Sequence, residues 1–231
     1  MRRFWMACWL SCATLAGSTM SFADEPKKPD APAKAADSKV IKLFDGKTLA
    51  GWKSTNFGGE GDVTIDDGVI VIDFGSELSG ITWQKEEVLP KSNYEITCEA
   101  KRIDGGDFFC GLTFPVKDSH CSLILGGWGG GVCGLSSIDG SDASENATTL
   151  YREFKTEQWY KIRLVVTDER IRTWVDGKEI IDANIKDKKI GIRGEVELSK
   201  PLGFATWRTK GAIKNPVLKK LDAKEVAEAL K

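Results

Sequence analysis

Short stretches in which apolar and polar residues alternate fill the chain from residue 40 to residue 221. They include residues 94–100, 108–114 and 159–166. Alternation with a period of two predicts β-strands that bury one face. Turn sequences such as Asp66-Asp67-Gly68 separate these stretches, and they are typical of hairpins. The pattern therefore predicts an all-β domain, a two-sheet antiparallel β-sandwich or jelly roll.

The two ends of the chain have different patterns. Residues 222–231 are rich in Ala, Glu and Lys, which predicts a short C-terminal helical tail. At the other end, two arginines precede an apolar run and small residues up to Ala23. This order predicts a signal peptide over residues 1–23, and the run is short for a membrane span. We therefore expect an exported protein, periplasmic or secreted after cleavage.

Residues 24–39 consist mostly of Pro, Ala, Lys and Asp without apolar periodicity. This composition predicts a disordered, solvated linker. Such a linker would hold the folded domain away from a surface, or it would be a leader without a role of its own.

Charge and composition exclude several function classes. The chain has 231 residues, 33 Lys and Arg, 34 Asp and Glu, and a net charge of −1. It therefore lacks the basic character of a nucleic-acid-binding protein. His120 is the only histidine, which excludes a metal site built from two or three histidines. Phosphate-binding loops, dinucleotide fingerprints and nucleophile elbows are also absent from the sequence.

Four cysteines follow one another at nearly equal intervals, with a turn sequence near each midpoint. They are Cys98, Cys110, Cys121 and Cys133. This spacing predicts that they lie in one row on the buried face of a four-stranded meander. They are either buried free thiols, which behave as small apolar residues, or disulfides between adjacent strands of an exported protein.

The opposite face of that meander would carry the candidate catalytic residues. In this register His120 stands between Gly111 and Gly134, and Glu99 lies nearby. A single imidazole with a carboxylate on an open sheet face is typical of the floor of a polar groove, so His120 and Glu99 are the candidate catalytic pair. The alternative is that His120 is an ordinary surface histidine.

Loops near this face supply candidate substrate-binding residues. Trp128 lies in the glycine-rich turn 126–131, where its ring would cover the face of a sugar or would pack inward. Asp107 and Asn146 are the polar candidates for hydrogen bonds to sugar hydroxyls. Two further tryptophans, Trp159 and Trp174, occur in strongly alternating stretches and are predicted to lie in the core.

The loop from residue 136 to residue 149 is acidic. Asp139, Asp142 and Glu145 occur there together with hydroxyl residues. Oxygen ligands at such spacing suit Ca²⁺ or another divalent cation, although the loop has no EF-hand pattern. The same side chains would otherwise bind sugar hydroxyls or be only solvated.

Several phrases of the sequence resemble one family. The phrase LFDGKTLAGW at residues 43–52 is the most specific of them. The others are Asp66-Asp67-Gly68-Val69, residues 158–160 with 173–177, and residues 190–193 with 213–217. Together they resemble the 3-keto-disaccharide hydrolases, or 3-keto-glucoside lyases and hydratases, over nearly all of residues 40–221. The chain departs from the family pattern where Gly194-Glu195-Val196 replaces a His-Gly and at 107–111, where an Asn-Ser-Gly phrase is replaced.

This resemblance implies a concanavalin-like jelly roll that acts on 3-keto-glycosides. The ketone at C3 acidifies the proton on C2, a base removes that proton, and the enolate eliminates the group at C1. Such a site needs a base and a cation or donors for the enolate oxygen. His120 with Glu99 would supply the base, and an ion at residues 139–146 or a lysine or arginine would stabilise the enolate. The alternative is a non-catalytic carbohydrate-binding or cell-surface adhesion module on the same fold.

Overall fold

The structure is a computed structural model that describes residues 39–231. The predicted signal peptide and all but the last residue of the predicted linker lie outside the described residues. Within the described part of the chain, no helix has the length and apolar character that a membrane span requires.

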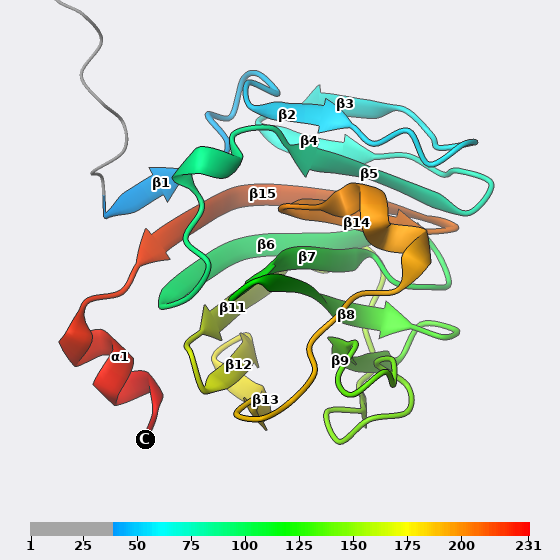
Figure 1. Ribbon diagram of the computed structural model, residues 1–231. Coiled ribbons are helices and arrows are strands. Elements are labelled where there is room, and N and C mark those ends of the chain that lie inside the picture. Colours follow the sequence, from blue (N-terminus) through cyan, green and yellow to red (C-terminus); the bar gives the residue numbers. More distant parts are fainter. Residues whose placement is uncertain (1–38) are drawn as a thin grey trace, which may run out of the picture. The chain divides into compact units, whose positions relative to one another are not determined.

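The described residues form two antiparallel sheets that pack face to face, as predicted from the alternating pattern (Figure 1). The first sheet consists, in spatial order, of Lys178–Asn184 (β13), Arg170–Val175 (β12), Tyr160–Val166 (β11), Tyr94–Gly105 (β6), Thr209–Lys220 (β15), Val69–Ile72 (β4) and Val63–Asp66 (β3), with Val40–Lys42 (β1) paired to β15. The second consists of Leu150–Tyr151 (β10), Val132–Ser136 (β9), Ser119–Gly127 (β8), Cys110–Val116 (β7), Gly203–Trp207 (β14), Leu78–Trp83 (β5) and Trp52–Ser54 (β2).

Within residues 39–231, three short helical segments accompany the sheets. Two are 3₁₀ helices, at Glu86–Val88 and Gly194–Ser199, and the second lies against β5 and β14. The third is the C-terminal helix Ala223–Ala229 (α1), which agrees with the predicted tail. The Asp222 carboxylate caps the first turn by accepting from the backbone N–H of Glu225, and the Glu225 carboxylate accepts from the backbone N–H of Asp222.

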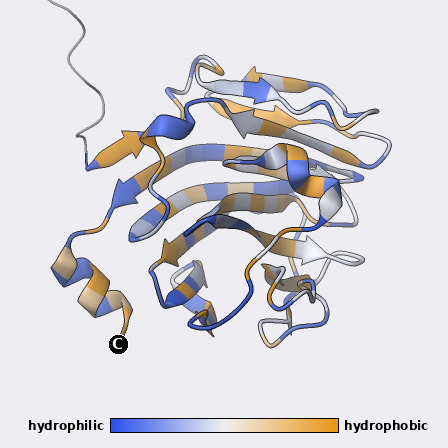
Figure 2. Cartoon of the chain, in the orientation of Figure 1, coloured by the Kyte–Doolittle hydropathy of each residue, from blue (hydrophilic) through white to orange (hydrophobic). Residues whose placement is uncertain are grey.

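Alternation along β6 shows how the sequence builds the core. Tyr94, Ile96 and Cys98 point into the sandwich and are buried, whereas Glu95 and Glu99 point outward. Figure 2 shows the corresponding bands of hydrophilic and hydrophobic residues along the long strands. Strands β7, β8 and β9 are buried on both faces over most of their length. Chain segments therefore cover much of the outer face of the second sheet.

The predicted row of four cysteines is wrong. Cys98 lies in β6 of the first sheet and Cys110 in β7 of the second, because the connection after Gly105 crosses the sandwich instead of forming a hairpin. Within the second sheet, Leu125 of β8 is the cross-strand partner of both Cys110 and Cys133. The cross-strand partner of Cys121 is Phe114. All four thiols are buried and free.

The position predicted for His120 is wrong for the same reason. Ile124, not His120, stands between Gly111 and Gly134 in the register of β7, β8 and β9. His120 faces Pro115 near the start of β8. It does lie on the outer face, since its neighbour Cys121 points into the core.

Trp159 and Trp174 are also not core residues. Both are partly exposed on the outer face of the first sheet. The guanidinium of Arg163 lies 4.3 Å from the centre of the Trp174 ring, and that of Arg172 lies 5.1 Å from it. Cations stacked on an indole ring stabilise it at a partly exposed position, so alternation alone does not distinguish this face from the core.

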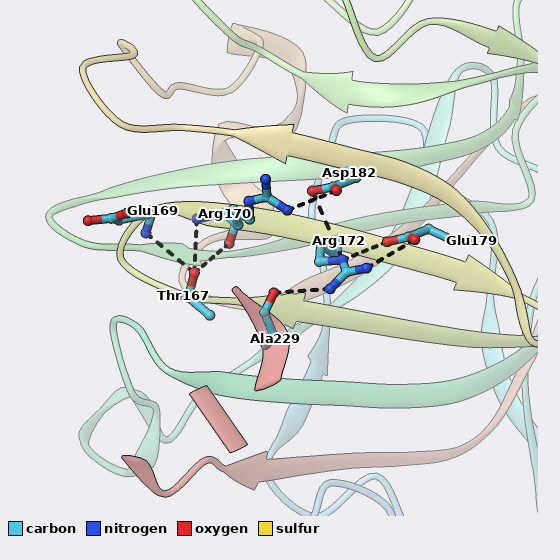
Figure 3. A network of polar contacts seen from close by, with 7 residues as sticks. All are labelled: Thr167, Glu169, Arg170, Arg172, Glu179, Asp182 and Ala229. Carbon is cyan, nitrogen blue, oxygen red and sulfur yellow. Dashed lines mark hydrogen bonds and ion pairs between the residues drawn. The ribbon is translucent and has the colours of Figure 1, made fainter. Parts of the chain in front are cut away.

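Arg172 of β12 connects this sheet to the C-terminal helix by a hydrogen bond, and ion pairs join β12 to β13 (Figure 3). Arg172 binds Glu179 through two hydrogen bonds and also donates to the backbone oxygen of Ala229, near the end of α1. Arg170 binds Asp182 on the neighbouring strand. The helix is therefore attached to β12 through its last turn.

Ion pairs in the first turn of α1 predict that acid destabilises this helix. Lys39 lies 2.9 Å from Asp222 and 3.0 Å from Glu225. The hydrogen bond from Lys39 lowers the pKa of Asp222 to about 2, and the hydrogen bond from Lys219 lowers that of Glu225 to about 2. Because both pKa values fall on folding, these contacts stabilise the helix fully above pH ~4.5 and are lost as the pH approaches ~2.

Carboxyl-carbon NMR titration measures this effect. Lys39→Ala should raise the pKa of Asp222 towards its ordinary value. Lys224→Ala, an exposed substitution in the same helix, is the matched control and should leave it low. Equal pKa values in the two variants would contradict the ion-pair assignment.

The buried cysteines predict a thiol count. Burial raises the pKa of Cys121 to about 12 and that of Cys133 to about 11, so thiolates are scarce near neutral pH. In protein that begins at residue 24, we expect no rapid reaction of these four thiols with Ellman's reagent in the native state. After unfolding without reductant, all four should react. A count below four would show a disulfide.

Candidate functional site

A cleft of about 250 Å³ opens on the outer face of the second sheet. Its floor is formed by Ser122 and Ile124 of β8, Ser136 at the end of β9, and Phe108 from the segment before β7. Ile124 fits between Gly111 and Gly134, where neither neighbour has a side chain. The floor is therefore largely apolar, with two hydroxyl groups beside it.

The two serines of the floor differ in their hydrogen bonds. The hydroxyls of Ser122 and Thr113 are hydrogen-bonded at 2.8 Å. The hydroxyl of Ser136 is buried and has no partner among the described residues. Buried hydroxyls without a partner are uncommon because their desolvation is costly. The hydroxyl of Ser136, which lines the cleft, is available to a polar ligand.

Trp128 and Asp107 form one rim of the cleft. Trp128 lies in the turn between β8 and β9, and its side chain is 45% exposed. The Asp107 carboxylate accepts hydrogen bonds from the backbone N–H of Phe108, at 2.8 Å, and of Gly129, at 3.1 Å. These bonds connect the segment before β7 to the turn that carries Trp128. Trp207, from the end of β14, adds a second indole ring to the lining.

A buried arginine holds this rim from inside the sandwich. Arg102 of β6 is 5% exposed. Its guanidinium donates to the backbone oxygens of Phe154, Asp107, Gly126 and Gly130, at 3.2, 3.0, 3.3 and 3.1 Å. Burial lowers its pKa, which the nearby Asp107 partly offsets. A Cβ atom at Gly126 would lie 2.6 Å from this guanidinium, so the loop requires glycine in order to enclose it.

Arg193 and Glu195 form the opposite rim, at the start of the 3₁₀ helix Gly194–Ser199. Arg193 binds Glu195 through two hydrogen bonds, of 2.6 and 3.3 Å, and binds Asp142 at 2.5 Å. The hydrogen bond to Glu195 raises the pKa of Arg193, and the same contact lowers that of Glu195. Burial alone would raise the pKa of Asp142, but hydrogen bonds from Ser144 and Arg193 outweigh it and lower the value. Both acids therefore stay ionised near neutral pH.

Backbone hydrogen bonds attach this rim to the sheet. Ser137 and Gly191 exchange two of them, of 2.6 and 3.1 Å. The hydroxyl of Thr82 in β5 donates to the backbone oxygen of Leu198 at 2.8 Å. The connection between β13 and β14 is thereby held over the sheet as a wall of the cleft.

The comparisons with known proteins agree with this architecture. The sequence model of the 3-keto-alpha-glucoside-1,2-lyase-like domain matches residues 39–219. The chain belongs to this family. No curated protein matches the chain.

Solved structures with similar folds share little sequence with this family member. The Crh5 transglycosylase in complex with NAG has a TM-score of 0.56 and 11% identity, covering 80% of this chain and 84% of its own. The carbohydrate-binding module CBM66 from Bacillus subtilis has a TM-score of 0.50 and 13% identity, covering 73% and 95%. A proposed glycosyl hydrolase from Parabacteroides distasonis has 0.50 and 16%, covering 79% and 94%. At these identities the similarity concerns the fold.

The predicted catalytic pair is not brought together in this 3-keto-alpha-glucoside-1,2-lyase-like domain. Glu99 points outward from the first sheet, where it contacts Lys214 at 3.4 Å and Asn215 at 3.3 Å. His120 points outward from the second sheet. The core therefore separates them. Burial lowers the pKa of His120, and its side chain lies two positions along β8 from Ser122, outside the lining of the cleft.

The predicted metal ligands are separated as well. Asp139 binds Lys188 at 2.8 Å, Asp142 binds Arg193, and Glu145 is exposed. No group of three or more His, Cys, Asp or Glu residues between 39 and 231 is arranged to hold a metal ion. Two of the three carboxylates are paired with cationic side chains, so the three do not come together as the predicted Ca²⁺ ligands.

Asn146 organises this loop instead of facing the cleft. Its amide donates to the backbone oxygens of Leu135, Ser141 and Asp142, at 2.7, 3.1 and 2.7 Å. Its oxygen accepts from Thr148. With donor and acceptor both occupied, Asn146 does not fit the predicted substrate-binding role.

Asp107 and Trp128 are the predicted residues that the structure does bring together. Sequence reasoning missed Arg193, Glu195 and Trp207. The departure from the family pattern at Gly194-Glu195-Val196 contains Glu195 and directly follows Arg193, so it pointed to this part of the site. Trp207 carried no comparable signal.

Arg102 yields a stability prediction. Arg102→Met should lower the free energy of unfolding by about 2–4 kcal/mol, because it leaves several buried carbonyl oxygens without donors. Arg102→Lys should recover only part of the loss, since an ammonium group lacks the planar fork that reaches them all. Urea unfolding measures the free energies of unfolding of both variants.

Arg208→Met is the control at an exposed arginine and should change the free energy of unfolding by less than ~0.5 kcal/mol. A similar small loss for Arg102→Met would contradict the assignment.

Proposed function

We propose that this domain is an exported enzyme that acts on 3-keto-glycosides by removing the C2 proton and eliminating the group at C1. The observation that carries the proposal is the cleft, which combines two tryptophans, a carboxylate that binds only backbone groups, and an arginine. Membership of the family supports the substrate class. Export is part of the proposal and rests on the signal peptide predicted from the sequence.

The lining suits a sugar ring. Indole rings at Trp128 and Trp207 offer apolar faces against which the C–H face of a pyranose packs. The buried hydroxyl of Ser136, which has no partner in the part of the chain that the structure describes, can donate a hydrogen bond to a sugar oxygen. Such a cleft, apolar with a few placed polar groups, is the usual form of a small-molecule site.

Asp107 is the proposed base. Its two observed hydrogen bonds come from backbone N–H groups, so no cationic side chain occupies it. A carboxylate also has lone pairs to spare after accepting two bonds. Glu195 is a poorer candidate, because its ion pair with Arg193 lowers its pKa and therefore its basicity.

Arg193 is the proposed partner of the enolate. When Asp107 takes the C2 proton, the C–H electrons form a C2–C3 double bond and negative charge moves to the oxygen at C3. A guanidinium at the rim stabilises that charge in a largely apolar cleft. As the enolate re-forms the ketone, the electrons of the C2–C3 double bond form a C1–C2 double bond and the bond from C1 to the departing oxygen breaks. That oxygen takes up the proton from Asp107. Addition of water to the resulting enone would complete a hydrolysis.

The decisive variant is Asp107→Asn. It keeps an oxygen that accepts one of the two backbone hydrogen bonds, but it cannot take a proton. We expect kcat/KM for a 3-keto-glucoside to fall by about 10²–10⁴-fold, with a free energy of unfolding within ~1 kcal/mol of wild type. Product analysis by mass spectrometry and thermal unfolding measure the two quantities.

Asp104→Asn is the matched control. Asp104 lies three residues earlier, is exposed, and accepts a local backbone hydrogen bond from Gly105, but it does not line the cleft. This variant should keep full activity. Undiminished turnover in Asp107→Asn would refute the role of Asp107 as the base.

A carbohydrate-binding module without turnover is the second candidate. The observation in its favour is that both acids on the Arg193 side have lowered pKa values and are held in ion pairs. A wild-type protein that binds 3-keto-glucosides but releases no product would establish this alternative.

A further inference from the structure

A second hollow adjoins the cleft on the far side of its rim. It has a volume of about 440 Å³, and its lining includes Gly106, Gly129, Tyr151, Arg152 and Glu153. We refer to it as the side hollow. None of the sequence motifs that suggested a site includes Tyr151, Arg152 or Glu153.

The two hollows share a narrow boundary. Asp107 lines the cleft and its neighbour Gly106 lines the side hollow, while Trp128 and Gly129 are divided in the same way. Consecutive Cα atoms lie about 3.8 Å apart, so the boundary is only about one residue thick at both places. The hydrogen bond from Gly129 to Asp107 fastens its two sides together. A ligand that extends from the cleft over this rim would enter the side hollow.

Glycines keep the side hollow open. A Cβ atom at Gly106 or Gly129 would meet no other atom within 4 Å, and one at Gly131 would meet only the backbone oxygen of Arg152. Gly129 has a φ of +86°, which explains the absence of a side chain there. Gly106 has no positive φ, so its backbone does not require glycine. The absence of a side chain there leaves the hollow open.

The side chains around the hollow suit a sugar. Tyr151 lies on the edge strand β10 and is 79% exposed, the highest value among the large apolar and aromatic residues of the described chain. Arg152 supplies N–H donors, although it also contacts Asp176 at 3.2 Å. Glu153 supplies acceptors and forms no ion pair within residues 39–231. An exposed ring beside mixed donors and acceptors matches the two faces of a pyranose, which are one apolar and one rich in hydroxyls.

We propose that the side hollow is a second sugar subsite, which holds the ring attached through C1 to the sugar in the cleft. This inference rests on the proposed function and specifies its ligand as a glycoside of at least two rings. Tyr151 packs against the second ring, and the glycines let that ring lie close to the backbone. The departing group of the elimination would then leave from the side hollow.

Titration calorimetry with two probes tests this subsite. The one-ring probe is a methyl 3-keto-glucoside, and the two-ring probe is a 3-keto-disaccharide. Wild type should bind the two-ring probe more tightly. Tyr151→Ala, which removes an exposed ring, and Gly106→Val, which fills open space, should each weaken the two-ring probe by about tenfold, equivalent to ~1.4 kcal/mol, and leave the one-ring probe unchanged.

Phe74→Ala is the control. Phe74 is also an exposed aromatic residue, but it lines neither hollow, so its removal should change neither affinity. Equal affinities of wild type for the two probes, or equal losses for both probes in the variants, would overturn the subsite.

The outcomes separate this inference from the proposed enzyme. If wild type prefers the two-ring probe in a Tyr151-dependent manner but releases no product, the subsite stands and the enzymatic proposal fails. If wild type releases product from both probes with no preference, the enzyme stands and the subsite fails. If wild type binds neither probe, both proposals fail.

Discussion

The guanidinium of Arg102 is the contact on which the site depends. It comes from the first sheet, yet its hydrogen bonds end on loops that belong to the second. A buried arginine is costly to desolvate, and here carbonyl oxygens replace the water that it loses. In return, one side chain fixes the segment of Asp107 and the turn of Trp128 relative to each other. Those two segments are far apart in sequence and form both the rim of the cleft and the boundary of the side hollow.

The architecture was predictable because it depends on local patterns. Alternation located most of the long strands, and Asp66-Asp67-Gly68 marked the hairpin between β3 and β4, where Asp67 and Gly68 both have positive φ. The pairing of the strands was not predictable in the same way. A strand that follows a turn such as the one at Gly105 either pairs with the preceding strand or crosses to the other sheet, and the turn sequence is compatible with both. The neighbours of β6 are β11 and β15, which lie far along the chain.

That one ambiguity accounts for much of the error in the predicted site. A register that pairs Cys110 with Cys98 also puts His120 between two glycines and Glu99 near it, whereas in the structure the core separates the two side chains. Asp107 and Trp128 were unaffected, because the glycine-rich turn and the segment before β7 can be identified locally. Arg193 and Glu195 reach the cleft on a long connection between the two sheets. Their place depends on tertiary contacts such as that of Thr82 with Leu198, which no local pattern encodes.

The chain segment that carries Arg193 and Glu195 can change its side chains more easily than the rest of the site. Within the 3₁₀ helix Gly194–Ser199, Ser199 is the only buried residue, and the attachments of the wall to the sheet are largely made by backbone atoms. Apart from Val196, which packs against the floor, its side chains can therefore be exchanged without disturbing the core. A change in the loops around Arg102 would instead disturb the Asp107 and Trp128 rim together with the boundary of the side hollow. Selection on such a molecule would retain the half of the site that contains Asp107 and vary the half that contains Arg193. Related proteins could in this way acquire different sugar preferences while keeping one sandwich.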